Sequence, residues 1–426
     1  MSILIKGAIV VTQNEKREMA RNDVLVVDNR IEEVAKGINE KAEYVIDAKG
    51  RILMPGLINM HTHVAMTLFR GYGEGLPLAR WLEEKIWPIE AKQTPKDARI
   101  AAMLAIVEML RGGTTAFCDQ CLLGAKEIGQ AANEIGIRAH VSQGLFDLLP
   151  GRDFEGESIA MERAAYPQDR LVSYGIGPHS PYTCSDKMLS KAGTFAKKQK
   201  RKLHMHVSET RKETFDVLKD HNKRPFEYLD SLGLVNQDSI FAHASWVTKK
   251  EIAIAGAKKL NVVTCPASNL KLATGGICPV FEYEEAGANV CIGTDSAASN
   301  NSLNMFESMK LTALLQKHRY WKADIISAQK VLDFATINGA KALDMGKHAG
   351  MIKKGALADL VVLDHGANLT PGLDHISNIV YAAHPGNVSH VIVDGKPIIM
   401  DCRFVGFDEP ALLDRAEELA VEMMKR

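Results

Sequence analysis

The stretch GLINMHTHVAMTLFRG, residues 56–71, combines a short apolar run with a His-Thr-His triplet. Residues 57–61 are typical of a buried β-strand. His61 and His63 stand two residues apart, so on an extended chain their side chains point to the same side. Two imidazoles placed together in an apolar core would each need hydrogen-bond partners. The pair is therefore either a satisfied core pair or a metal-binding pair, and this stretch alone leaves both interpretations open.

Seven further apolar runs follow, with helical patterns between them, at residues 114–119, 137–143, 171–179, 202–207, 239–243, 261–265 and 289–295. Eight strands alternating with helices predict an α/β protein built on a (β/α)₈ TIM barrel. A doubly wound open sheet has a similar alternation. The barrel is favoured because polar residues end most of the runs, and the carboxyl ends of barrel strands meet at one rim. These residues are His61, Asp119, His179, His206, His243, Cys265 and Asp295.

The two ends of the chain share a different pattern of short β-rich runs broken by Asn, Asp and Gly. We therefore expect residues 1–56 and 349–426 to form one composite β-sandwich domain. Residues 57–348 would form the catalytic barrel. The last residues, EPALLDRAEELAVEMMKR (409–426), have the pattern of an amphipathic helix.

Composition excludes several classes of protein. The formal net charge is zero, and one basic run at residues 197–202 is a poor footprint for nucleic acid, so no nucleic-acid partner is expected. No apolar stretch is long enough to span a membrane, and the first residues lack the features of a signal peptide. Seven cysteines spread along the chain indicate reduced thiols. We expect a cytoplasmic enzyme without a membrane partner.

The rim residues suit metal chemistry. HVSETR supplies His206 with Glu209, FAHASW supplies His243, and GTDSAASNNS supplies Asp295. Imidazoles combined with a carboxylate are a ligand set for zinc or ferrous iron that leaves a position for water. The alternative for Glu209 is a solvated carboxylate in the first turn of a helix.

The motifs PGLINMHTH, HVSET, FAHASWV, CPASNLKLATGG, CIGTDSAASNNSLNMFESMK and GALADLVVLD occur in this order along nearly the whole chain. Together they resemble the amidohydrolase superfamily, and more narrowly its deaminases of methylthioadenosine, S-adenosylhomocysteine and 5′-deoxyadenosine. The resemblance implies one Zn²⁺ or Fe²⁺ ion held by His61, His63, His206 and Asp295. It also implies that Glu209 and His243 act on water and substrate, and that the protein is a homo-oligomer, either a dimer or a tetramer.

One departure indicates a single metal ion. Family members with two metals carry a bridging lysine at the end of the fourth strand, where this chain has GPHSPYT with His179. In the chemistry expected of such a site, Asp295 accepts the proton of water and His243 orients the water. Glu209 delivers a proton to a ring nitrogen, since adding hydroxide to an aromatic ring requires that protonation. The products would be the inosine analogue and ammonia.

The segment LARWLEEKIWPIE, residues 78–90, suits a nucleoside. Trp81 and Trp87 offer flat apolar faces, and Glu90 can accept hydrogen bonds from vicinal hydroxyls. An ordinary amphipathic helix broken at Pro88 is the alternative. The resemblance implies that Glu90 binds the ribose, that His179 contacts the base, and that Trp81 and Ser299 line the pocket.

The end of the pocket that would hold homocysteine departs from the family. Relatives that take S-adenosylhomocysteine place an arginine after the third strand, where this chain has Gln143; Arg152 in LLPGRDFEG is a candidate for a second arginine. A neutral glutamine cannot make the paired bonds of a guanidinium with a carboxylate. We expect a preference for uncharged 5′ groups. Alternatives on the same scaffold are a guanine deaminase, a triazine or chloro-s-triazine hydrolase, and a non-catalytic scaffold protein.

Overall fold

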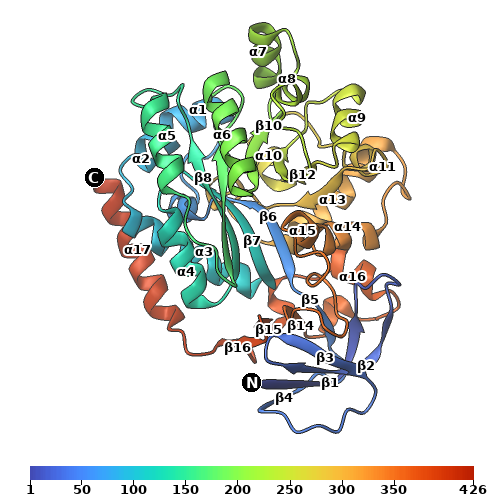
Figure 1. Cartoon of the computed structure of the whole chain (residues 1–426). Helices are drawn as coiled ribbons and strands as arrows, with labels where there is room; N and C mark the ends of the chain where they lie inside the picture. Colours follow the sequence, from blue (N-terminus) through green and yellow to red (C-terminus); the bar gives the residue numbers. More distant parts are fainter.

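The computed structural model describes residues 1–426, which form two sheets (Figure 1). Eight parallel strands make the central sheet, paired in the order β13-β12-β11-β10-β9-β8-β7-β6. Their bounds are β6 (Leu57–Thr62), β7 (Thr114–Cys121), β8 (Arg138–Leu145), β9 (Val172–Pro178), β10 (Leu203–Val207), β11 (Ser239–His243), β12 (Asn261–Thr264) and β13 (Asn289–Ile292). Each of the eight predicted runs forms a strand, so the predicted barrel is confirmed.

The first and last barrel strands meet just beyond the end of β13. The amide of Asp295 donates to the carbonyl of His61 over 2.9 Å, and the amide of Thr294 donates to Asn59 Oδ1 over 3.0 Å. Gly293 permits this approach, because a Cβ atom there would lie 2.8 Å from the backbone nitrogen of His61. The contact nearly closes the barrel and brings Asp295 to the same rim as His61.

Helices cover the outside of the barrel (Figure 1). Most of the long ones begin at a residue whose side chain caps the first turn. In α3 (Pro95–Arg111) the side chain of Thr94 accepts from the amide of Asp97, which bonds back in a capping box, and the helix stops at Gly112. The other long helices are α4 (Ala125–Ile135), α5 (Phe154–Arg163), α6 (Asp186–Gln199), α7 (Arg211–His221), α9 (Lys249–Ala257) and α13 (Met305–Tyr320). A core of 77 buried residues fills the space between these helices and the strands and continues into the terminal sheet.

Both ends of the chain contribute to a second, mixed sheet of nine strands. Its strands are β1 (Ser2–Val11), β2 (Met19–Val27), β3 (Arg30–Ala35), β4 (Tyr44–Asp47), β5 (Ile52–Pro55), β14 (Leu360–Leu363), β15 (Val388–Val393), β16 (Lys396–Met400) and β17 (Arg403–Phe404). The two ends join where β5 pairs antiparallel with β14. The sheet encloses its own core of 17 buried residues. The domain boundaries at residues 57 and 349 stay a prediction.

The C-terminal helix α17 (Glu409–Lys425) leaves this sheet and packs on the barrel beside α3 (Figure 1). Its residues Ala416, Leu419 and Met423 share an apolar cluster with Phe69 and Trp81. None of the helices, α17 included, combines the length and the apolar character needed to cross a bilayer.

Candidate active site

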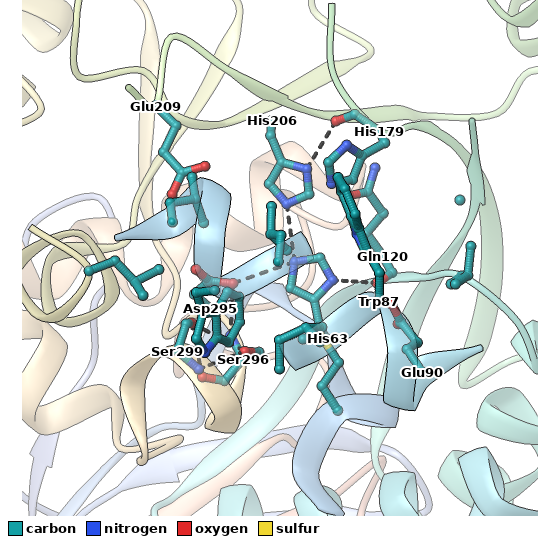
Figure 2. Close-up of a pocket in the computed structure, with 18 of the residues that line it drawn as sticks. His63, Trp87, Glu90, Gln120, His179, His206, Glu209, Asp295, Ser296 and Ser299 are labelled. Carbon is teal, nitrogen blue, oxygen red and sulfur yellow. Dashed lines mark hydrogen bonds and ion pairs between the residues drawn. The ribbon is translucent and has the colours of Figure 1, made fainter. Parts of the chain in front are cut away.

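A cavity opens at the carboxyl ends of the barrel strands (Figure 2). Glu209 and Glu90 lie on opposite sides of His63, and Asp295 lies beside it. His61 is fully buried beneath the cavity. Most of the side chains predicted from the sequence line this cavity: His63, Trp81, Glu90, His179, His206, Glu209, His243, Asp295 and Ser299.

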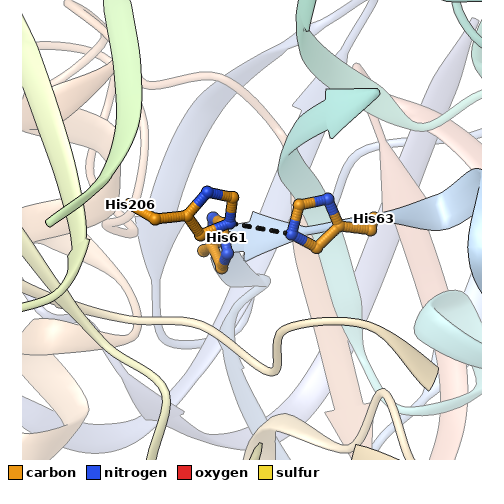
Figure 3. Close-up of side chains that lie close together, drawn as sticks. All are labelled: His61, His63 and His206. Atoms are coloured by element: carbon orange, nitrogen blue, oxygen red, sulfur yellow. Dashed lines mark hydrogen bonds between the residues drawn. The ribbon is translucent and has the colours of Figure 1, made fainter. Parts of the chain in front are cut away.

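Four histidines and one carboxylate present metal-binding atoms to a common space. His61 groups with His63 and His206, and it also groups with His243 and Asp295; within each group the ligand atoms lie within 4.8 Å of one another (Figure 3). Asp295 Oδ1 is 3.5 Å from His61 Nε2 and 3.4 Å from His63 Nε2. His61 Nε2 is buried and has no hydrogen-bond partner in the protein. A buried polar atom without a partner is costly unless a bound ligand satisfies it.

The hydrogen bonds of two histidines fix where their lone pairs point. His63 Nδ1 donates to the carbonyl of Gln120 over 2.7 Å, and His206 Nδ1 donates to the carbonyl of His179 over 2.9 Å. A neutral imidazole carries one proton, so both Nε2 atoms are left with lone pairs, and these atoms face each other at 3.0 Å. Two lone pairs in this position repel unless a cation lies between them. The donor set therefore fits a divalent metal ion.

His204 supports His61 from below. His61 Nδ1 and His204 Nε2 lie 2.8 Å apart, and His204 Nδ1 lies 3.5 Å from the sulfur of Cys118. All three residues are buried. Such a partner fixes the ring orientation of a ligand histidine, as partners behind metal ligands commonly do.

Asp295 and Glu209 differ in charge because their surroundings differ. Burial opposes ionisation of Asp295, but His61, His243 and His63 outweigh it and hold the pKa of this carboxyl well below its usual value. Burial, with the nearby charges of Asp295 and Glu213, raises the pKa of Glu209 well above its usual value. Asp295 is therefore a carboxylate, while the raised pKa of Glu209 favours its protonated form, which can donate a proton.

His243 is held neutral and close to Glu209. Burial lowers the pKa of His243 to about 3, and its Nε2 lies 3.8 Å from Glu209 Oε2. His243 and Asp295 both have left-handed backbones, with φ of 70° and 62°. Residues other than glycine adopt this conformation at a cost, and such residues cluster at functional sites. The strained backbone turns both side chains toward the centre of the rim.

The opposite side of the cavity carries a buried carboxyl group. Glu90 is 8% exposed, and burial raises its pKa to about 7. It ends α2 (Trp87–Glu90), which follows a π-helical turn, η2 (Leu82–Ile86), and α1 (Leu78–Trp81). His179 also lines the cavity, and its Nδ1 lies 3.0 Å from Thr183 Oγ1 and 3.2 Å from Ser180 Oγ.

These features agree with comparisons to known proteins. The sequence profile of the amidohydrolase family matches residues 52–398. The chain belongs to the amidohydrolase family. The expected family and its barrel fold are thereby confirmed.

Relatives of this amidohydrolase match it over their whole length. It is 39% identical to the 5′-deoxyadenosine deaminase of Methanosarcina mazei, with 100% of this chain and 99% of the relative covered. It is also 39% identical to the 5-methylthioadenosine/S-adenosylhomocysteine deaminase of Clostridium tetani, covering 99% of each. The crystal structure of an adenosine deaminase from Xanthomonas campestris, solved with bound zinc, superposes with a TM-score of 0.95 at 33% identity, covering 100% of this chain and 99% of that one.

Two predicted substrate contacts of this amidohydrolase lie outside the cavity lining. The side-chain amide of Gln143 donates to the carbonyls of Leu122 and Gly144, each over 3.1 Å. Arg152 donates to Glu157 Oε1 over 2.8 Å, and its guanidinium lies 6.0 Å from the ring of Phe146. Gln143 is held by two backbone carbonyls, whereas Arg152 makes one ion pair, with Glu157, and its charge also acts to lower the pKa of Glu90.

Sequence reasoning missed several residues of the site. His204 carries the clearest signal, since LHMHV (203–207) repeats the spacing of His61 and His63. Ser268 and Asn269 lie in the quoted motif CPASNLKLATGG, but nothing local links them to Asp295 and His243. Apolar side chains of the lining come from several elements that have no common sequence pattern: Leu78, Leu82, Ile86, Leu122, Phe146 and Leu272.

Proposed function

We propose that this amidohydrolase is a metal-dependent deaminase of adenine nucleosides modified at the 5′ position. Its substrates would be 5′-deoxyadenosine, 5′-methylthioadenosine, S-adenosylhomocysteine and adenosine, and its products the inosine analogues and ammonia. The observation that carries the proposal is the pair of unprotonated Nε2 atoms of His63 and His206, 3.0 Å apart beside the protonated Glu209. Full-length relatives named as deaminases of such nucleosides support it.

His61, His63, His206 and Asp295 would hold one ion, either Zn²⁺ or Fe²⁺. Such an ion lowers the pKa of a bound water to about 7 and so supplies a nucleophile at neutral pH. His61 Nε2 is buried without a partner in the protein, as expected of a ligand atom. The charged Asp295 would accept the proton of the water.

Glu209 and His243 would handle the remaining proton transfers. The raised pKa of Glu209 favours its protonated form, and this proton would go to the ring nitrogen next to the carbon under attack. Neutral His243, 3.8 Å from Glu209, would orient the attacking water by a hydrogen bond. Loss of ammonia then restores the aromatic ring as the oxo purine.

Glu90 would bind the ribose hydroxyls and His179 the base, while Trp81 and Ser299 pack against the nucleoside. The position of Glu90 across the cavity from Glu209 supports this orientation (Figure 2). A preference for uncharged 5′ groups is supported because Gln143 is neutral and its amide donates to two backbone carbonyls.

A substrate panel tests the proposal. The zinc-loaded or iron-loaded enzyme should convert 5′-deoxyadenosine and 5′-methylthioadenosine to inosine analogues, followed by the ultraviolet change and by ammonia release. The kcat/KM for S-adenosylhomocysteine should be lower. Turnover of free guanine or of a chlorotriazine, without turnover of any adenine nucleoside, would refute the proposal.

We further propose that the protein is a cytoplasmic homo-oligomer, either a dimer or a tetramer. The high structural similarity to one adenosine deaminase over the whole chain is consistent with a complete barrel in each subunit. Light scattering coupled to size exclusion would measure the mass; a monomer at micromolar concentration would refute the oligomer.

A further inference from the structure

We propose that Ser268 and Asn269, adjacent residues on α10 (Pro266–Lys271), position the two groups that act on water: Ser268 holds Asp295, and Asn269 sets the proton of His243. The inference rests on the proposed function for its catalytic consequences. Its structural content, which nitrogen of His243 carries the proton, is independent of the substrate.

The short helix α10 follows β12 directly and fixes both side chains at the rim. Its first residue is Pro266, and the amide of Asn269 donates to the carbonyl of Cys265 over 3.1 Å. Ser268 is fully buried and Asn269 is 6% exposed. Ser268 Oγ lies 2.6 Å from Asp295 Oδ2, and Asn269 Nδ2 lies 3.1 Å from His243 Nδ1. One dipeptide thus contacts two different strand ends.

The contact of Ser268 decides which oxygen of Asp295 faces the histidines. A carboxylate only accepts, so the single hydroxyl proton of Ser268 goes to Oδ2. Ser299, 2.8 Å from Ser268, must then be the donor in that second pair. Asp295 Oδ1 accepts from the amide of Ser296 over 2.8 Å. The same oxygen lies beside the Nε2 atoms of His61 and His63. Ser268 therefore holds the carboxylate with Oδ1 toward the metal-binding atoms.

The contact of Asn269 makes His243 different from His63 and His206. Those two histidines donate from Nδ1 to backbone carbonyls and keep lone pairs on Nε2. The amide nitrogen of Asn269 is a donor, so His243 Nδ1 accepts from it and the proton of the neutral ring sits on Nε2. A protonated Nε2 cannot bind a metal ion. His243 is thereby a hydrogen-bond donor to water and not a ligand, although its nitrogen lies close enough to be one.

Replacing Asn269 tests this assignment. In Asn269→Asp the carboxylate accepts from Nδ1, which moves the proton and frees Nε2. X-ray absorption of the zinc-loaded variant should then show one more imidazole per metal than the wild type, and kcat should fall by about 100-fold or more. Asn269→Ala should leave the imidazole count unchanged and lower kcat by about 10–100-fold, as for other residues behind a metal site.

The outcomes separate the inference from the proposed function. An unchanged imidazole count in Asn269→Asp would overturn the assignment, whatever the change in kcat. The coordination measurement needs no substrate, so it still decides the inference if the enzyme deaminates no adenine nucleoside. Leu270→Ala is the matched control, because this neighbour on α10 is 49% exposed and should change neither coordination nor kcat.

Ser268 is tested by a pair of variants. Ser268→Ala should lower kcat by about 10–100-fold with KM changed less than about threefold, and it should still bind close to one metal per chain. Ser268→Thr keeps the hydroxyl and should recover most of kcat. A threonine variant as impaired as the alanine variant, or a loss confined to KM, would overturn the positioning role of Ser268.

Discussion

At the scale of single residues, two buried carboxyl groups, Glu209 and Glu90, lie on opposite walls of the cavity and differ in pKa. Glu209 lies beside His243, and burial with neighbouring negative charge raises its pKa well above the usual value. Glu90 is buried at the far wall, and its pKa is raised to about 7. The raised pKa of Glu209 favours its protonated form, whereas Glu90 titrates near neutral pH.

Glu209→Gln removes the proton donor and keeps the shape of the side chain. We expect kcat for 5′-deoxyadenosine to fall by about 10²–10⁴-fold, the usual contribution of a positioned acid, while the metal content is unchanged. Steady-state kinetics with metal analysis would measure both. A glutamine variant with more than a tenth of the wild-type kcat would show that the ring is protonated by another group.

Glu90→Gln should stabilise the protein at high pH. A carboxyl whose pKa is 4.5 when unfolded and about 7 when folded binds more protons in the folded state, so the free energy of unfolding falls as pH rises between these values. The loss is at most about 3 kcal/mol, since each pKa unit is worth about 1.4 kcal/mol. The variant should match the wild type near pH 4 and exceed it at pH 8, with a higher KM for nucleosides.

Denaturant unfolding of the metal-saturated enzyme across this pH range would measure the difference. Glu83→Gln is the matched control, because Glu83 lies on the same segment but is exposed. Equal stability of Glu90→Gln and the wild type at pH 8 would contradict the raised pKa of Glu90.

At the scale of elements, the strands and the long helices follow from local patterns, whereas the wall of the cavity does not. Apolar runs, most of them ending in His, Asp or Cys, predicted β6 to β13. The segment 78–90 has an ordinary helical pattern, yet it contains the π-helical turn η2. Ile86 of that turn and Ile89 just after it share an apolar cluster with residues from distant parts of the chain, which no local pattern records.

Helix α17 supports that wall. Leu419 is 1% exposed and lies in the same apolar cluster as Trp81 and Phe69. Leu419→Ala should lower the free energy of unfolding by about 2–5 kcal/mol, as expected when a leucine leaves a cavity. KM should rise more than kcat falls, because the wall carrying Trp81 loosens.

Leu413→Ala on the same helix provides the control, since Leu413 is 47% exposed and its loss should cost less than about 0.5 kcal/mol. Thermal and denaturant unfolding with nucleoside kinetics would compare the two variants. Equal effects of the two substitutions would show that α17 does not support the cavity wall.

At the scale of the whole molecule, a buried ion-pair network joins the barrel to the terminal sheet. Arg138, the first residue of β8, donates to Asp359 Oδ2 over 2.6 Å and to Asp394 Oδ1 over 2.8 Å. The side chain of Arg138 is 5% exposed, and those of the two aspartates are 8% and 2% exposed. The network fixes the two sheets relative to each other.

Arg138→Met should lower the free energy of unfolding by about 3–5 kcal/mol, because it leaves the buried carboxylate of Asp359 without its partner, while Asp394 Oδ2 keeps its ion pair with Arg170 over 2.6 Å. Adding Asp359→Asn should recover part of the loss by removing the uncompensated charge. Denaturant unfolding measures all three proteins. A single variant within about 1 kcal/mol of the wild type would show that water already screens the network.

The sequence by itself determined the barrel, its rim and the residues gathered there. Strand and helix patterns depend on neighbours along the chain, and parallel strands bring their carboxyl ends to one rim whatever the details of packing. Only the tertiary structure decided the hydrogen-bond partners of the Nδ1 atoms of His63 and His243. It also decided that Gln143 and Arg152 lie outside the cavity lining and that α17 packs on the barrel. Those features depend on contacts between residues far apart in the chain, where the identity of a residue does not specify its partner.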